Sequence, residues 1–162
     1  MTQIKLEHSA FQEALKLLTG RDYSEAELRS RLSRHGYESK AIDDAIARCK
    51  ECGYLDTARF AANRARGLFS RGQAVGGRVK EDLRRRGVDA EIIETVMQEM
   101  TAEFPAPELL GQILERRFAG FDFRQADMRS KNRVLGYFLR RGFSRDVVLQ
   151  ALYEQSRRKE QS

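Results

Sequence analysis

Three short stretches of this sequence share one form: Leu32-Ser33-Arg34-His35-Gly36-Tyr37, Leu83-Arg84-Arg85-Arg86-Gly87-Val88 and Phe138-Leu139-Arg140-Arg141-Gly142-Phe143. In each stretch the glycine follows an apolar residue by four positions and directly precedes another apolar residue. Further apolar residues recur eight positions before each glycine, and five, six, nine and ten positions after it. The glycines are 51 and 55 residues apart, so this agreement indicates one structural unit used three times.

The spacing of the apolar residues predicts helices in every repeat, because intervals of four to five positions place them on one helical face. Residues that can cap a helix stand at the expected starts: Ser9, Ser24, Asp56, Asp89 and Ser144. Ser9 and Ser24 are followed three residues later by Gln12 and Glu27, which completes a capping box. Glycines that can adopt the left-handed conformation stand at the expected ends: Gly20, Gly36, Gly53, Gly72, Gly87, Gly120 and Gly142.

We therefore predict an all-α protein of three tandem three-helix repeats, packed into an elongated, curved array. The repeats are expected at residues 1–55, 56–104 and 105–162. Their helices are expected at 9–19, 24–35, 39–52, 56–70, 75–86, 89–102, 107–119, 125–141 and 144–157. Pro107 suits a first helical turn, where its missing N–H has no partner to lose.

The composition describes a basic protein with a large polar surface. Charged residues make up 33% of the 162 residues, above the average of about 25%, and the net charge is +6. Residues 1–56 carry −1, residues 57–104 carry +2 and residues 105–162 carry +5, so contact with a polyanion is expected mainly from the second and third repeats. No apolar run is long enough to span a membrane, and the first residues lack the apolar core of a secretory signal, so we expect a cytoplasmic protein. We also expect it to be a monomer.

The sequence contains no recognisable catalytic or metal-binding motif. Only His8 and His35 can serve as imidazole bases, and no nucleophile motif accompanies them. Cys49 and Cys52 form a CxxC pair without the second pair that a zinc site needs, so Cys49 is expected in the apolar core. The glycine-rich segment 72–77 is followed by Arg78-Val79, where a phosphate-binding loop has a lysine and a hydroxyl residue. We expect no enzymatic activity and no cofactor.

Arginines gather immediately before the repeat glycines. Arginine at a helix C-terminus stabilises the helix dipole, but recurrence in adjacent repeats favours a shared binding ridge. Arg64 stands at the edge of the buried stripe, so it is expected either to pair with a neighbouring acid or to bind directly. The candidates for contact with a polyanionic partner are Arg59, Arg64, Arg66, Arg78, Lys80, Arg84, Arg85, Arg86, Arg129, Lys131, Arg133, Arg140 and Arg141.

Two stretches carry a family resemblance: Tyr23-Ser24-Glu25 with the later Gly36-Tyr37, and Gly53-Tyr54-Leu55-Asp56 with Arg59-Phe60-Ala61. They resemble the RecX family of bacterial RecA regulators, and the resemblance continues through the second and third repeats. One departure is Thr57, where family members often have a second acid after Asp56. The resemblance implies a non-enzymatic protein that binds RecA along the helical groove of its DNA filament. Such proteins usually suppress ATP hydrolysis and strand exchange, and so modulate recombination, repair and the SOS response.

Two other functions fit the residues. A small transcription regulator would use one three-helix repeat as a helix-turn-helix that reads duplex DNA, although no repeat has a distinctive recognition helix. A basic helical adaptor would bind acidic proteins without RecA or DNA. Weak non-specific contact with DNA is expected to be mainly electrostatic, because no pattern for base readout is present.

Overall fold

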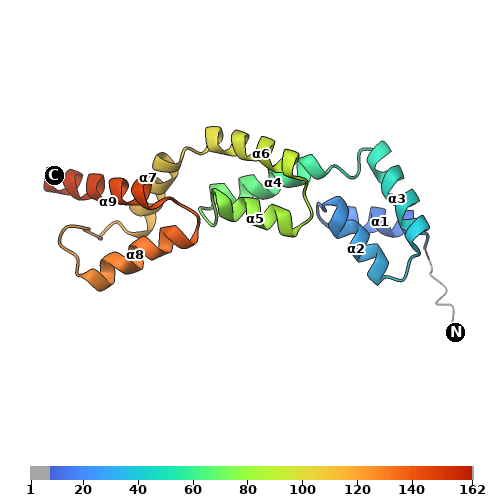
Figure 1. Cartoon of the computed structure of the whole chain (residues 1–162), viewed down its shortest axis with the longest axis horizontal. Coiled ribbons are helices and arrows are strands. Elements are labelled where there is room, and N and C mark those ends of the chain that lie inside the picture. Colours follow the sequence, from blue (N-terminus) through green and yellow to red (C-terminus); the bar gives the residue numbers. More distant parts are fainter. Residues whose placement is uncertain (1–7, 162) are drawn as a thin grey trace. The chain divides into compact units, whose positions relative to one another are not determined.

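A computed structural model describes residues 8–161, and within them the regular secondary structure is all helix, with no strand (Figure 1). Nine helices are seen in this part of the chain: α1 (Ala10–Gly20), α2 (Glu25–Arg34), α3 (Ser39–Glu51), α4 (Thr57–Ser70), α5 (Gly77–Arg85), α6 (Ala90–Glu103), α7 (Ala106–Arg117), α8 (Met128–Arg140) and α9 (Arg145–Glu160). The all-α prediction is confirmed, and most helix boundaries lie within two residues of those expected. None of these helices is long and apolar enough to cross a membrane.

Side-chain caps begin several helices as the sequence predicts. The Ser9 hydroxyl accepts from the Gln12 N–H at 3.2 Å, while the Gln12 side chain accepts from the Ser9 N–H at 2.9 Å. Ser24 and Glu27 form the same reciprocal capping box at the start of α2. These contacts satisfy backbone donors that the first helical turn leaves without partners.

Asp127 caps α8 by accepting from the Ser130 N–H at 2.7 Å. This cap was not predicted, and it moves the start of α8 from residue 125 to Met128.

The repeated glycines end their helices with one common backbone pattern. The residue after each glycine donates its N–H to the carbonyl five positions earlier: Tyr37 to Leu32 at 3.3 Å, Val88 to Leu83 at 3.1 Å and Phe143 to Phe138 at 3.2 Å. This bond is characteristic of a helix end with a left-handed residue. Gly87 and Gly142 have φ of 75° and 100°. Gly20 and Gly120 do not have positive φ, so that expectation was wrong for them; α1 instead ends in extended backbone at Arg21.

The first three helices enclose a core of their own. Helices α1 and α2 both pack on α3, and the buried side chains are Ala14, Tyr23, Leu28, Leu32, Ile42, Ile46, Cys49 and Leu55. Cys49 is fully buried among them, as its place on the apolar face of α3 predicts. Burial of one leucine or isoleucine side chain contributes about 1.5–3 kcal/mol, so this cluster sets the positions of the α2 side chains.

Helices α7, α8 and α9 form a second packed group, in which α9 contacts both α7 and α8. Phe138 is fully buried and lies 5.6 Å from the Phe143 ring, measured between ring centroids. The buried Ser156 hydroxyl accepts from the Phe123 N–H at 3.1 Å and donates to Asp122 at 2.9 Å. These bonds hold the segment between α7 and α8 against α9.

The described chain divides into two compact units. The first contains the residues up to 64 together with 82–96, and the second contains 65–81 together with those from 97 onward. Helices α4, α5 and α6 contribute to both units, and their apolar faces are buried at Phe60, Ala65, Val79, Leu83 and Ile93. The expected repeat boundaries describe sequence units, and they stay a prediction.

Candidate anion-binding surface

Arginines from two helices that are far apart in the sequence meet in the first compact unit. In α2, Leu28 and Leu32 are fully buried, so Arg31 and Arg34 in the last turn face outward and are exposed. In α5, Leu83 is fully buried, so Arg84 and Arg85 in the last turn are likewise exposed. The same local pattern, an inward leucine followed by arginines before a helix-ending glycine, produces both sets.

The ends of α2 and α5 border a hollow of about 510 Å³. Its lining residues are Arg21, Tyr23, Ala26, Glu27, Ser30, Arg31, Arg34, Arg84, Arg85, Arg86 and Gly87. Six of them are arginines and one is a glutamate, which leaves a net formal charge of +5. A concave surface with this charge concentrates its positive potential and attracts anions.

Close backbone packing brings the end of α5 against the start of α2. A Cβ atom on Gly87 would lie 2.4 Å from the Ala26 Cβ, so only glycine allows this approach, and its φ of 75° also favours glycine. The Ser24 hydroxyl donates to the Arg86 carbonyl at 2.5 Å, which ties the end of α5 to the start of α2. The hollow therefore exists because α2 and α5 pack together, although the two helices are far apart in the sequence.

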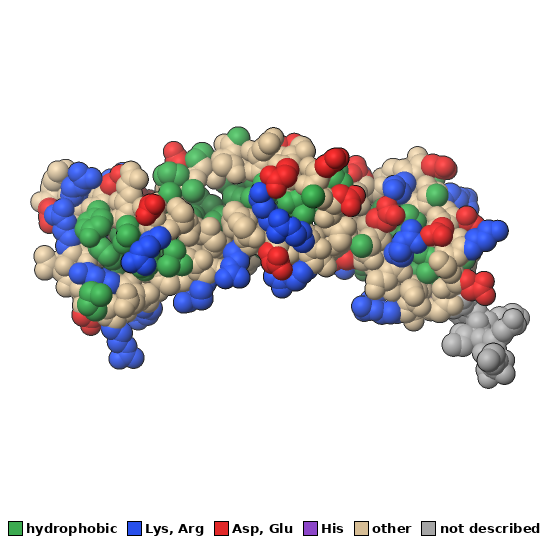
Figure 2. Space-filling view, in the orientation of Figure 1, with side chains coloured by type: hydrophobic (Ala, Val, Ile, Leu, Met, Phe, Trp, Pro, Cys, Tyr) green, Lys and Arg blue, Asp and Glu red, His purple; other side chains and the backbone are tan. Residues whose placement is uncertain are grey.

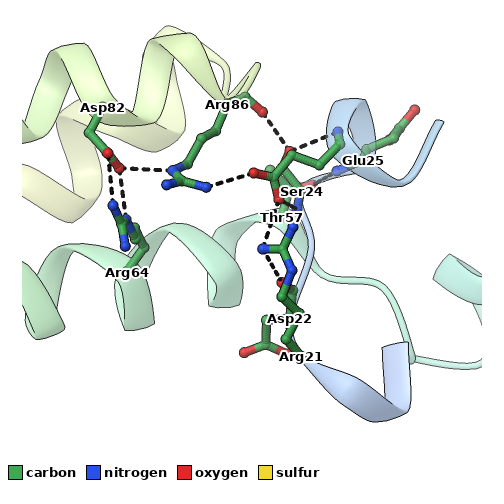
Figure 3. A network of polar contacts seen from close by, with 9 residues as sticks. Arg21, Asp22, Ser24, Glu25, Thr57, Arg64, Asp82 and Arg86 are labelled. Atoms are coloured by element: carbon green, nitrogen blue, oxygen red, sulfur yellow. Dashed lines mark hydrogen bonds and ion pairs between the residues drawn. The ribbon is translucent and has the colours of Figure 1, made fainter. Parts of the chain in front are cut away.

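A network of ion pairs lies beside the hollow (Figure 3). Arg64 on α4 donates from Nε and Nη2 to the two carboxylate oxygens of Asp82 on α5, at 2.8 and 2.9 Å. Arg86 donates to Asp82 at 3.0 Å and to Glu27 on α2 at 2.7 Å. Hydrogen bonds from Arg64 and then from Arg86 hold the pKa of the Asp82 carboxyl below its usual value, against the opposing effect of burial. The expected pairing of Arg64 with an acid is confirmed.

Other predicted arginines also have partners within the chain. Arg66 lies 3.1 Å from Glu103, and Arg59 approaches the Gly53 and Tyr54 carbonyls at 3.4 Å. The Arg141 guanidinium lies 3.5 Å from the centroid of the Tyr137 ring, where a cation–π interaction holds it. These contacts give each side chain a structural role within the chain, and binding of an outside partner by them stays a prediction.

A second basic surface lies on α8. Arg129, Arg133 and Arg140 are exposed on the side opposite the buried Val134 and Phe138. Within the part of the chain that the structure describes, these three arginines form no ion pair. Lys131 on the same helix lies 5.3 Å from the Phe123 ring centroid. On α5, Arg78 is exposed and Lys80 is partly buried.

The predicted candidates thus fall into separate groups. Arg84, Arg85 and Arg86 belong to the hollow, whereas Arg129, Lys131, Arg133, Arg140 and Arg141 belong to α8 and its end. Sequence reasoning missed the hollow's other arginines, Arg21, Arg31 and Arg34. The net charge of −1 over residues 1–56 concealed them, although Arg34 precedes Gly36 as Arg84–Arg86 precede Gly87. Figure 2 shows why the net charge of this segment is small: over α1–α3, basic side chains lie next to acidic ones.

Comparison with known proteins identifies related sequences over most of the chain. Residues 10–49 match the first three-helix domain of RecX, and residues 56–97 match its second three-helix domain. The chain is 42% identical to the regulatory protein RecX of Syntrophotalea carbinolica, over 90% of this chain and 95% of that protein. It is 37% identical to the RecX of Trichlorobacter lovleyi, over 93% of this chain and 97% of that protein.

The fold also matches a solved structure. The crystal structure of RecX from Lactobacillus salivarius superposes with a TM-score of 0.71, at 19% identity, over 90% of this chain and 94% of that one. This likeness concerns the fold alone.

Proposed function

We propose that this chain, which belongs to the RecX family of regulatory proteins, regulates RecA by binding the RecA–DNA filament. In this proposal it acts without enzymatic activity, in the cytoplasm and as a monomer. It lies in the filament groove, and the expected effect is suppression of ATP hydrolysis and of DNA strand exchange.

The observation that carries the proposal beyond family membership is the presence of exposed arginines in both compact units. One set lines the hollow between α2 and α5, and the other follows α8. A RecA–DNA filament repeats along its axis and contains a phosphate backbone, so a chain with two basic surfaces can contact it at more than one place. Two linked contacts bind more tightly than either one alone, because the second contact forms within an already assembled complex.

A RecA ATPase assay on single-stranded DNA tests the proposal directly. Adding the full chain is expected to lower the rate of ATP hydrolysis, and the same preparation is expected to reduce strand exchange. A variant with Arg129→Gln, Arg133→Gln and Arg140→Gln should lower the rate less at equal concentration. The matched control is Arg116→Gln, Arg145→Gln and Arg157→Gln, which removes the same charge from exposed positions on α7 and α9.

The outcome also separates the other two functions. A transcription regulator would bind one duplex sequence strongly and leave RecA unaffected. A basic adaptor would bind acidic proteins with RecA and DNA both absent. An unchanged rate of RecA ATP hydrolysis at saturating concentrations of this chain would contradict the proposal.

A further inference from the structure

We propose that the hollow between α2 and α5 binds the phosphodiester backbone of single-stranded DNA. The inference rests on the proposed function, since it names the component of the filament that this surface contacts. It also assigns a DNA-contacting role to the first three-helix segment, whose net charge alone predicts none.

The charge of the hollow exceeds what the two helix ends require. Each helix C-terminus carries about half a negative charge, and one arginine in the last turn stabilises it by about 0.3–1 kcal/mol. Six arginines against one glutamate line the hollow. Glu27 is engaged by Arg86 at 2.7 Å and by Arg21 at 3.5 Å. Arg31 and Arg34 have no carboxylate partner among residues 8–161, so their charge is available to an outside anion.

The side chains of the hollow suit phosphate because they are arginines and because several are held in place. A guanidinium presents paired N–H groups that match two oxygens of one phosphate. Arg21 stacks on the Tyr23 ring at 3.8 Å, and Tyr23 itself is buried. Arg86 is held between Glu27 and Asp82. Groups that are ordered before binding lose less conformational entropy when the ligand arrives.

The concave shape favours a single strand over a duplex. The hollow's volume of about 510 Å³ is within the range of about 300–1,000 Å³ for ligand pockets. A flexible single strand can bend its phosphates into such a space, whereas a duplex is stiff over about 150 base pairs and presents a convex surface. The side chain of Arg21 is 53% exposed, so a base of the same strand can stack on the guanidinium face away from Tyr23.

Binding of a fluorescein-labelled oligothymidine to the full chain, measured by anisotropy with RecA absent, tests the inference. The hollow variant carries Arg31→Gln and Arg34→Gln, and the control carries Arg116→Gln and Arg157→Gln, which removes equal charge from exposed positions on α7 and α9. Circular dichroism first establishes that both variants keep the helical content of the parent chain.

The salt dependence gives the sharpest expectation. For a single strand, the slope of log K against log salt concentration is about −0.7 for each phosphate contacted. Loss of two contacts should therefore make the slope less negative by about 1.4 in the hollow variant, and the control should keep the parent slope. Arg31→Lys with Arg34→Lys keeps the charge but loses the paired N–H geometry, so it should retain the slope and bind several-fold more weakly.

Three results would overturn the inference. The first is a hollow variant whose affinity and slope equal those of the control. The second is a parent chain that binds duplex DNA more tightly than the single strand. The third is a hollow variant that keeps oligothymidine binding but no longer affects RecA ATP hydrolysis, which would place an acidic protein surface in the hollow and leave the proposed function standing. A parent chain that binds oligothymidine as expected but never affects RecA would support this inference while contradicting the proposed function.

Discussion

Replacement of Arg64 by glutamine should destabilise the fold far more than the same replacement of Arg66, two residues away on α4. Arg64 pairs through two hydrogen bonds with Asp82, and the two side chains are 33% and 23% exposed. The side chains of Arg66 and Glu103 are 45% and 42% exposed. Because water screens an ion pair in proportion to its exposure, the first pair contributes more to stability although both contain an arginine and a carboxylate.

The size of the destabilisation expected for Arg64→Gln follows from the partial burial of the side chain and from its hydrogen bonds to Asp82. Hydrogen bonds to a charged group contribute about 1.5–3 kcal/mol when buried. Exposed ion pairs contribute about 0–1 kcal/mol. The Arg64–Asp82 pair is intermediate, and Asp82 keeps its bond from Arg86, so Arg64→Gln should lower the free energy of unfolding by about 1–2 kcal/mol.

Urea unfolding followed by circular dichroism measures both variants in one buffer. A double-mutant cycle of Arg64→Gln and Asp82→Asn separates the pairwise energy from effects on each residue alone, and a coupling of about 1–2 kcal/mol is expected. The reasoning is refuted if Arg64→Gln shifts the unfolding midpoint no more than Arg66→Gln, or if the coupling energy is zero within error.

Three further predictions concern pH, backbone conformation and a buried hydroxyl. The pKa of Asp82 is lower in the native protein than in the unfolded chain, so the carboxylate should stabilise the fold fully above the unfolded pKa of about 3.9. This stabilisation should disappear as the pH falls through the native pKa. The urea midpoints of the parent and Asp82→Asn should therefore converge in acid. Gly142→Ala should destabilise the protein more than Gly36→Ala in thermal unfolding. Both glycines have positive φ, but only the Gly142 Cβ would meet the Val75 carbonyl oxygen, at 2.2 Å. Equal losses of thermal stability would show that φ alone matters. Ser156→Ala should lower the free energy of unfolding by about 1–3 kcal/mol, since it leaves the Phe123 N–H buried without its acceptor, and an unchanged urea midpoint would contradict this.

The helices of this protein follow directly from its amino-acid sequence. Ser9 and Ser24 form their capping boxes with residues three positions away, and Tyr37, directly after the glycine that ends α2, donates its N–H to a carbonyl only five positions earlier. These interactions span less than two helical turns, so all the residues that form each of them lie within one short stretch of the sequence. The start of α8 is set by an equally local interaction, because Asp127 accepts from the N–H of Ser130, three positions later.

The composition of the basic hollow was decided by tertiary structure. Arg34 and Arg84 are fifty residues apart, and they line one hollow because Gly87 packs against Ala26. A charge total over residues 1–56 cannot show this, since the acids of the segment cancel Arg31 and Arg34 in the sum, although among the described residues those acids pair with other cations such as Arg21 and Arg29. Likewise, the sequence placed Arg64 at the edge of a buried stripe and left two roles open, and the approach of α5 to α4 supplied Asp82 as its partner. Helix formation depends on hydrogen bonds between near neighbours in the chain, whereas the partner of a surface arginine depends on which distant side chain the packed core brings within about 3 Å.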